Sequence, residues 1–395
     1  MPDINSTIQS RVSFYRDDII SFLRDIVAIP SPDGQIKGVG QRVADEMTRL
    51  RYDEVRFDRM GNVLGRIGNG KRVLLYDSHL DTVGIGDPAA WQWHPFKGKV
   101  EKGILFARGA CDEKGSTPGM VYALAILKEV GLAEDWTLYY FGNMEEACEG
   151  IAPQALVEVE GIRPDMVVIG EPTKMGIYRG QRGRLQMSVV TKGRSAHAAS
   201  SHLGENAVYK MLPIIAGVRD MQDKLAGHHF LGKGGAVVTK IECQTPSLNA
   251  VPDECTIYID RRLTFGESKE AALAQVKSLP GAAQAVVSVL FYDRPSYTGY
   301  VFPVEEYYPA WVLPAEHTLV QAGEATIRAA FGREPVVGKW SFSTNGVYWM
   351  GKAGIPSIGF GPGDEVYAHS ISDQVRLDEV VQSTLFYALL PQMLA

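Results

Sequence analysis

Short segments with the pattern of a β-strand alternate with helix-like segments along most of this chain. Apolar residues recur every three or four positions over 8–26 and 39–50, which predicts two amphipathic helices. Beyond them, the expected strands 54–58, 63–67, 72–76, 137–141, 166–169, 335–339 and 356–360 are interleaved with the expected helices 119–130, 153–160, 318–331 and 377–390. Strands that alternate with helices predict an α/β fold, with a mainly parallel sheet flanked by helices.

The segment from about residue 183 to residue 292 has a different order. An expected strand at 185–192 is followed by a helix at 205–225, strands at 236–244 and 255–263, a helix at 267–279 and a strand at 284–292. This βαββαβ order is typical of ferredoxin-like domains. We therefore predict a discontinuous α/β domain of residues 1–181 and 294–395, with an inserted ferredoxin-like domain of residues 182–293.

Composition excludes several classes of protein. The 395 residues are 45% hydrophobic and 22% charged, which is enough for a large core. The net charge of −6, without a long basic run, argues against nucleic acid as the main partner. The longest apolar stretches, 120–127 and 285–291, are far shorter than the roughly 20 residues that span a bilayer. The four scattered cysteines and a charged N-terminal region without an apolar core indicate a cytoplasmic protein with no membrane partner.

Acidic residues and histidines follow five expected strands, which are four of those named above and a further short strand at 105–108. These clusters are His79 with Asp81, Asp112 with Glu113, Glu145 with Glu146, Glu171, and His369. In open α/β sheets, ligands bind beyond the carboxyl ends of the strands, so we expect all five clusters to meet at one edge. Two histidines among carboxylates form a nitrogen and oxygen site suited to zinc, cobalt or manganese. The surplus of carboxylates predicts two metal ions that share a bridging carboxylate.

Each cluster has an ordinary interpretation when it is taken alone. A His-x-Asp pair is common, and the pair Glu145 and Glu146 is typical of an exposed helix start. An acidic residue after a strand, such as Asp112 or Glu171, often caps the next helix. The placement of all five clusters after strands, in a chain with eight histidines, favours the metal site.

Several stretches of this sequence resemble the di-zinc metallopeptidase and deacylase family that includes acetylornithine deacetylase, succinyl-diaminopimelate desuccinylase, aminoacylase and glutamate carboxypeptidase. They are SHLDTV at 78–83, RGACDEKG at 108–115, the pair Glu145 and Glu146, GEPT at 170–173, AHS at 368–370, GRSAHA at 193–198, LNAVP at 248–252 and DRR at 260–262. The match covers nearly the whole chain. The stretches YRGQRGR at 178–184, YDRPS at 292–296 and WSFSTNGV at 340–347 look closest to the selenium-metabolism-linked branch of that family.

The resemblance implies a role for each matching residue. It places His79 and Glu171 on one zinc ion, Glu146 and His369 on the other, and Asp112 between them. Asp81 would orient His79, and Glu145 would be the general base. His197, as a catalytic residue, and Asn249 would contact the substrate and the transition state, and Arg262 would pair with a substrate carboxylate. The resemblance also implies a cis peptide between Asp112 and Glu113.

These roles predict a di-zinc amidohydrolase of the deacylase or carboxypeptidase type, in which cobalt or manganese could replace zinc. The expected substrate is a small molecule, an N-acyl amino acid or a small peptide, whose linear amide bond is cleaved by water. The resemblance further implies that the inserted domain is a lid or dimerisation domain, and that the protein is a homodimer through it, with His197 completing the site of the neighbouring subunit. Two alternatives remain open: the same site could act on a carbamoyl or ureido group, or the chain could be a non-catalytic binding protein that retains the fold.

Overall fold

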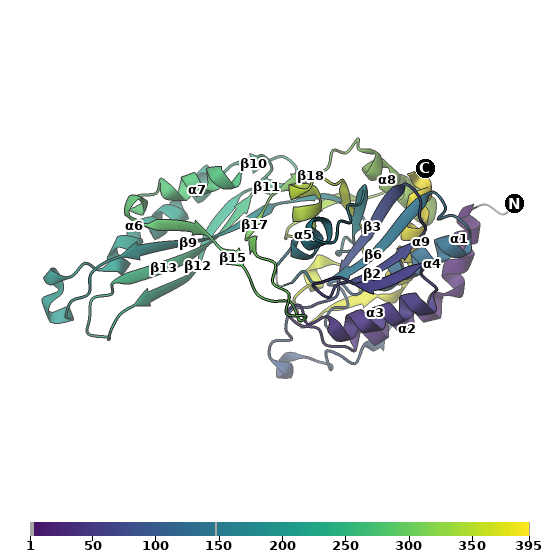
Figure 1. Ribbon diagram of the computed structural model, residues 1–395, viewed down its shortest axis with the longest axis horizontal. Coiled ribbons are helices and arrows are strands. Elements are labelled where there is room, and N and C mark those ends of the chain that lie inside the picture. Colours follow the sequence, from purple (N-terminus) through teal and green to yellow (C-terminus); the bar gives the residue numbers. More distant parts are fainter. Residues whose placement is uncertain (1–3, 147, 395) are drawn as a thin grey trace.

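The computed structural model describes residues 4–146 and 148–394, which form a main part and a projecting part (Figure 1). The main part holds the larger sheet and most of the helices, and the projecting part holds the sheet built around strand β9. The helices are α1 (Ile4–Phe14), α2 (Arg16–Val27), α3 (Lys37–Arg49), α4 (Thr117–Glu129), α5 (Ile151–Glu158), α6 (Ala207–Asp220), α7 (Lys269–Lys277), α8 (Thr318–Phe331) and α9 (Leu377–Met393).

The larger sheet has a parallel centre and antiparallel margins. Its strands run in the spatial order β1 (Glu54–Phe57), β2 (Val63–Ile67), β6 (Trp136–Asn143), β3 (Arg72–His79), β7 (Met166–Ile169), β20 (Ser357–Gly359), β8 (Ile177–Gln181) and β18 (Trp311–Val312), and β19 (Val337–Trp340) also pairs with β8. Strands β6, β3, β7 and β20 are parallel neighbours. The predicted α/β class, with a mainly parallel sheet between helices, is confirmed.

The central strands are buried because helices cover the sheet. In β3, every residue from Leu74 to His79 is buried, as is typical of parallel strands with both faces covered. Helix α4 is buried from Thr117 to Leu127. Its aromatic neighbours include Tyr15, whose ring meets that of Tyr122 edge-on at 5.3 Å.

The projecting part has the βαββαβ order within residues 183–289. Its sheet runs β12 (Gly235–Gln244), β13 (Glu254–Leu263), β9 (Gly183–Lys192) and β14 (Val286–Val289), with β17 (Tyr307–Tyr308) also paired to β9. Burial alternates along β9 and β13, so that one face packs against α6 and α7 in a core of its own. The other face is polar and carries Arg184, Gln186 and Ser188 on β9.

The predicted boundary at residue 293 is not a sharp one. Strand β17 joins the projecting sheet although it lies beyond that residue. Short pairs also occur between β10 (Gly227–His228) and β11 (Gly232–Lys233), and between β15 (Phe291–Tyr292) and β16 (Val304–Glu305). The domain limits therefore remain a prediction, and their outermost positions, residues 1 and 395, lie outside the described residues.

Four sequence-based predictions about individual elements were wrong in extent or in pairing. The helix expected over 8–26 breaks at Tyr15, where the hydroxyl donates to Glu129 and the chain divides into α1 and α2. The strand expected over 284–292 divides into β14 and β15, and the helix expected over 205–225 ends at Asp220. The strand expected at 105–108 is β5 (Ile104–Phe106), which belongs to a separate sheet with β4 (Lys99–Glu101) and β21 (Gln374–Arg376).

Among the described residues, no helix has the combination of length and hydrophobicity that crossing a bilayer requires.

Candidate metal centre

A cavity of about 380 Å³ lies where the main part meets the projecting part, and we refer to it as the main cavity. The predicted ligands and base that line it are His79, Asp112, Glu145, Glu146, Glu171 and His369. The other lining residues are Glu149, Arg184, Arg262, Phe342, Ser343, Glu365 and Ala368. The structure thus brings all five acidic and histidine clusters to one place.

Four of the clusters reach the main cavity from neighbouring parallel strands. His79 is the last residue of β3, and Glu145 follows the end of the adjacent strand β6. Glu171 follows the end of β7, on the other side of β3. His369 comes from the longer loop after β20, in a backbone conformation with a φ of 57°. Because parallel strands end at the same edge, their carboxyl ends converge as the sequence pattern predicts.

Asp112 does not follow a strand of the larger sheet, although the sequence pattern predicts that it does. It lies on a loop after β5, outside the larger sheet. Asp373 holds this loop by accepting hydrogen bonds from the backbone N–H groups of Gly109 (2.7 Å) and Cys111 (2.8 Å) and from Arg108 Nη1 (3.1 Å). Burial raises the pKa of Asp373 to about 7. The peptide between Asp112 and Glu113 is cis, as the resemblance implies.

The two oxygens of Asp112 face two different histidines. Oδ1 lies 2.9 Å from His79 Nε2, and Oδ2 lies 3.2 Å from His369 Nε2. His79 Nε2 is also 3.6 Å from Glu171 Oε1, and His369 Nε2 is 3.4 Å from Glu146 Oε2. The carboxylate of Asp112 therefore stands between two sets, each made of one histidine and one glutamate.

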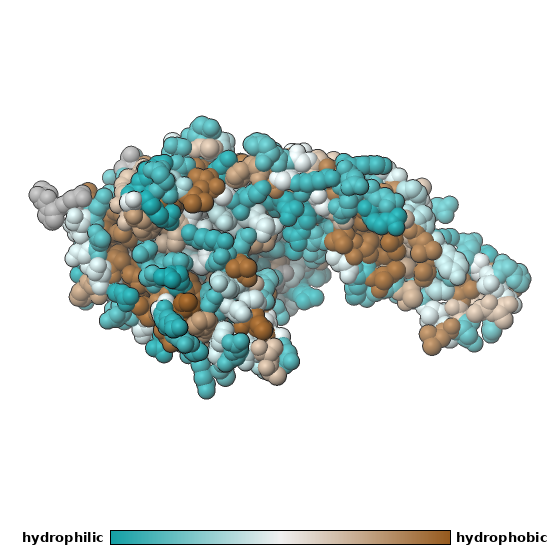
Figure 2. Space-filling view, turned by 180° about the vertical axis from the view of Figure 1, so that it is seen from behind, coloured by the Kyte–Doolittle hydropathy of each residue, from teal (hydrophilic) through white to brown (hydrophobic). Residues whose placement is uncertain are grey.

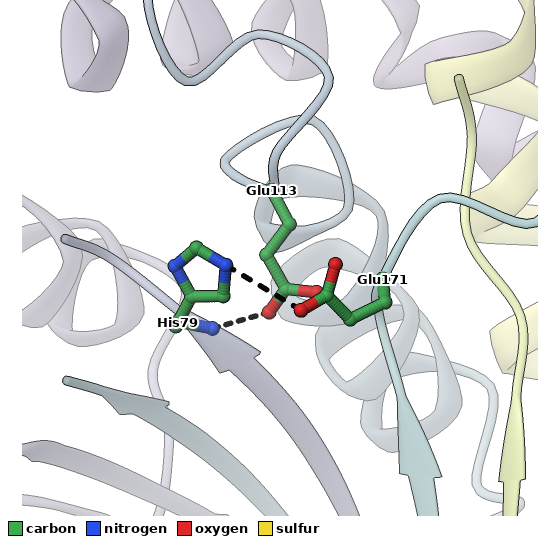
Figure 3. Close-up of side chains that lie close together, drawn as sticks. All are labelled: His79, Glu113 and Glu171. Atoms are coloured by element: carbon green, nitrogen blue, oxygen red, sulfur yellow. Dashed lines mark hydrogen bonds and ion pairs between the residues drawn. The ribbon is translucent and has the colours of Figure 1, made fainter. Parts of the chain in front are cut away.

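The sequence pattern places Glu113 in one of the five clusters but predicts no role for it. It accepts a hydrogen bond from the backbone N–H of His79, and with His79 and Glu171 it forms a group whose ligand atoms lie within 4.8 Å of one another (Figure 3). His79, Asp112 and Glu146 form a second such group. In the sequence, Glu113 is recognisable only as the acidic neighbour of Asp112. This position does not tell which of the two carboxylates contacts which histidine.

Asp81 links the histidine to the expected base. The Nδ1–H of His79 donates to the backbone carbonyl of Asp81 at 2.9 Å, while the Asp81 carboxylate oxygen Oδ1 is 3.6 Å away. That same Oδ1 accepts from the backbone N–H of Glu145 at 2.9 Å. These contacts leave His79 Nε2 directed at Asp112 and Glu171.

Burial and proximity change the pKa values of these groups strongly. Burial raises the pKa well above its usual value for the carboxyl groups of Glu113, Glu145 and Glu171. Burial has the same effect on Asp112, but hydrogen bonds from His369 and His79 outweigh it and lower the pKa of Asp112. Hydrogen bonds to Asp112 and Glu146 raise the pKa of His369 to about 10. The raised pKa of His369 means that the surrounding carboxylates favour a positive charge on this ring. A bound metal ion would supply that charge in place of the proton.

The residues present fit divalent cations. Buried carboxylate oxygens of Glu113, Glu145, Glu146 and Glu171 have no hydrogen-bond partner within residues 4–146 and 148–394. Buried polar atoms are normally paired, so unpaired oxygens at this density indicate a place for cations. The donor atoms are imidazole nitrogens and carboxylate oxygens, which suit zinc, cobalt or manganese.

The predicted substrate contacts are divided between two places. Arg262 lines the main cavity. His197 and Asn249 lie beside each other in the projecting part, where the Ala198 N–H donates to the Asn249 carbonyl at 2.8 Å and His197 Nδ1 accepts from Ala199 N–H at 3.0 Å. In the part of the chain that the structure describes, neither His197 nor Asn249 lines the main cavity.

Comparison with known proteins gives a consistent result. The model of the peptidase family M20/M25/M40 matches residues 75–392. An uncharacterised protein of Escherichia coli, YgeY, is 43% identical over 97% of this chain and 96% of its own length. Succinyl-diaminopimelate desuccinylase of Corynebacterium glutamicum is 28% identical over 95% of this chain and 96% of its own length. The crystal structure of Bacillus subtilis YxeP, described as a dinuclear metal-binding peptidase, has a TM-score of 0.68 at 15% identity, with 96% of this chain and 98% of that chain covered.

Replacement of Asp373 tests how the Asp112 loop is held. We expect Asp373→Ala to weaken Zn²⁺ affinity about 10- to 100-fold, the range seen when an outer hydrogen-bond partner of a metal site is removed. The measurement is competition with a chelator of known affinity. Asp378→Ala is the matched control, because Asp378 pairs with Arg376 in an exposed position. Equal Zn²⁺ affinity in Asp373→Ala and in the control would contradict this role.

Proposed function

The chain belongs to the peptidase family M20/M25/M40, and from this premise we propose that two divalent metal ions in the main cavity and Glu145 as general base make it a hydrolase of N-acyl amino acids or small peptides. That it is a hydrolase follows from the family. The name of the desuccinylase relative supports an acyl-amino acid substrate. The description of the similar Bacillus subtilis peptidase supports the pair of metals.

The observation that carries the proposal is that the carboxylate of Glu145 is buried, unpaired among the described residues and part of the cavity wall. Its side chain is buried in the wall of the main cavity, next to the two histidine and glutamate sets. Both carboxylate oxygens lack a hydrogen-bond partner among the described residues. Its backbone N–H is fixed by Asp81. A held carboxylate with two free oxygens beside a metal site is suited to accept a proton from water.

The proposed ligand sets follow the contacts of Asp112. His79 and Glu171 would hold one ion, and Glu146 and His369 the other, with one oxygen of Asp112 toward each histidine. Zinc ions, or cobalt or manganese in their place, would supply a water of lowered pKa and a polarised substrate carbonyl.

The residues of the chain then carry the proton transfers. Glu145 takes a proton from the attacking water and delivers it to the leaving nitrogen, so that an amine and a carboxylate are released. Asp81 keeps His79 oriented through the Nδ1 contact. An attack on a carbamoyl or ureido carbon would use the same groups, so the substrate range must be measured.

We also propose that the chain is a homodimer through the projecting part. Strand β12 lies at the end of its sheet and is exposed along most of its length, with Val237 and Ile241 each more than half exposed. Apolar side chains also gather in a patch on the surface of the projecting part (Figure 2). A long, exposed edge strand is a natural pairing surface. In such a dimer, His197 and Asn249 would serve the partner's site. A cytoplasmic location remains a prediction from the sequence.

The general-base role predicts a specific loss in Glu145→Gln. This change removes the proton acceptor while it keeps the size of the side chain. We expect kcat to fall about 100-fold or more, which is the scale of general-base catalysis, while metal content stays the same. The measurement is hydrolysis of N-acetyl, N-succinyl, N-carbamoyl and dipeptide substrates by zinc- or cobalt-loaded protein.

The control for this experiment is Glu365→Gln, because Glu365 lines the same cavity outside the proposed ligand and base set. Turnover of Glu145→Gln close to that of the wild type would refute the assignment. A screen in which the wild type hydrolyses none of the four substrate classes would refute the proposed activity itself.

The dimer predicts complementation between two inactive variants. When His197→Ala and Glu145→Gln proteins exchange subunits, one site of each mixed dimer carries neither change, so we expect activity to return. The measurement is hydrolysis after mixing, with the dimer established by light scattering. His202→Ala, a change at another exposed histidine of the same segment, should stay active alone. No recovery despite proven exchange would mean that His197 does not act across the dimer.

A further inference from the structure

Glu113 is a buried carboxylate to which the proposed ligand sets give no role. It is 1% exposed and follows Asp112 directly on the loop that Asp373 holds. Its Oε1 accepts a hydrogen bond from the backbone N–H of His79. Its Oε2 is buried and has no hydrogen-bond partner among the described residues. Because an unpaired carboxylate oxygen inside a protein costs free energy, a compensating group is expected beside it.

The carboxylate of Glu113 shares its surroundings with His79 and Glu171. The three residues offer one ligand atom each, and these atoms lie within 4.8 Å of one another (Figure 3). Oε2 of Glu171 is buried and unpaired as well, in the part of the chain that the structure describes. No lysine or arginine within residues 4–146 and 148–394 forms an ion pair with either glutamate. The two carboxylates therefore lack the positive charge that a bound cation would bring.

The two sides of Asp112 differ in their carboxylates and in their exposure. On the side of His79, both Glu113 and Glu171 are within reach. On the side of His369, Glu146 is the neighbouring glutamate, 3.4 Å from Nε2. The side chain of His79 is 2% exposed, whereas that of His369 is 58% exposed. An ion on the buried side must therefore draw its ligands mainly from the chain, whereas an ion on the exposed side can take water.

The number and kind of ligands decide which cation a site favours. Zinc is usually held by four ligands, and imidazole nitrogen suits it. Manganese favours six ligands in an octahedral arrangement, and carboxylate oxygens suit it. One imidazole with the carboxylates of Asp112, Glu113 and Glu171 forms an oxygen-rich ligand set. Such a set improves the binding of manganese relative to that of zinc.

We propose that Glu113 is a further ligand of the metal ion on the His79 side, and that it raises the affinity of this side for Mn²⁺ relative to Zn²⁺. The inference rests on the proposed function for the presence of the two ions, and it adds one residue to the ligands assigned there. The hydrogen bond from the His79 N–H holds Oε1, and Oε2 is the oxygen that remains for the ion.

The test measures metal affinity and does not depend on hydrolysis. All proteins carry His369→Ala, which removes a ligand of the other ion, so that the affinity reports the His79 side. Metal-free protein is titrated with Mn²⁺, and the free ion is measured by its electron paramagnetic resonance signal. Zn²⁺ affinity is measured on the same protein by competition with a chelator. The ratio of the two affinities is compared between variants.

Glu113→Gln keeps an oxygen for the N–H of His79 but removes the charge. We expect Mn²⁺ affinity to fall about 10-fold or more, because the loss of an outer partner of a metal site already costs that much. Zn²⁺ affinity should fall less, since His79, Asp112, Glu171 and one water still supply four ligands. Glu113→Met, which fills the space with an unbranched apolar chain, should lower the ratio in the same direction and serves if the amide variant does not fold.

Glu46→Gln is the matched control, because Glu46 is a buried carboxylate that pairs with Arg42 and Arg49 in another part of the chain. It should leave the ratio of Mn²⁺ to Zn²⁺ affinity unchanged.

Two results would overturn the inference. The first is an equal fall of both affinities in the Glu113 variants, which would mean that this residue only holds the backbone of His79. The second is no fall in either affinity. A wild type that binds fewer than two ions, or that fails the hydrolysis screen, would refute the proposed function, while the measured ratio would still decide the role of Glu113. Protein that binds neither metal would overturn both.

Discussion

The burial of many carboxyl groups in one place is the constraint on which this structure depends. Asp81, Asp112, Glu113, Glu145 and Glu171 are each less than 8% exposed, and all lie at the carboxyl end of the larger sheet or on the adjoining Asp112 loop. Removal of an ionised carboxylate from water costs several kcal/mol unless an opposite charge compensates for it. The chain supplies two histidines to this cluster, and divalent cations would supply the remaining positive charge.

Interactions around the cluster hold the ligands in place from outside. Asp373 fixes the loop of Asp112 through two backbone N–H groups and Arg108. Lys114 is buried, and its Nζ donates to the carbonyls of Ile26 and Ile29 near the end of α2, so that the same loop is tied to a helix. The position of the Asp112 loop therefore depends on residues that are far from it in the sequence. Such supporting contacts keep the side chains of a site in place.

The main cavity is lined by side chains from both parts of the chain. The larger sheet and its loops provide the histidines and carboxylates, whereas the polar face of the projecting sheet provides Arg184 and Arg262. This arrangement agrees with the general finding that function resides in sites placed on a fold rather than in the fold itself.

The sequence pattern predicts β3, β6 and β7, because each holds an apolar run that is followed within a few residues by site residues. The position of Asp112 on a loop outside the larger sheet could not be predicted. Strand β5 has the same local pattern as a strand of the larger sheet, and its pairing with β21 is a long-range contact. The contact between Glu113 and the backbone N–H of His79 could not be predicted for a similar reason. The two residues are 34 positions apart in the sequence, and no local pattern encodes their contact.

The central claim is that Asp112 stands between two metal ions, and elemental analysis tests it most directly. Protein freed of metal by chelation is reloaded with Zn²⁺, dialysed and counted for zinc per chain. The account predicts close to two ions for the wild type and for His197→Ala, and one or fewer for Asp112→Ala. One ion or fewer in the wild type, or two ions retained in Asp112→Ala, would contradict it.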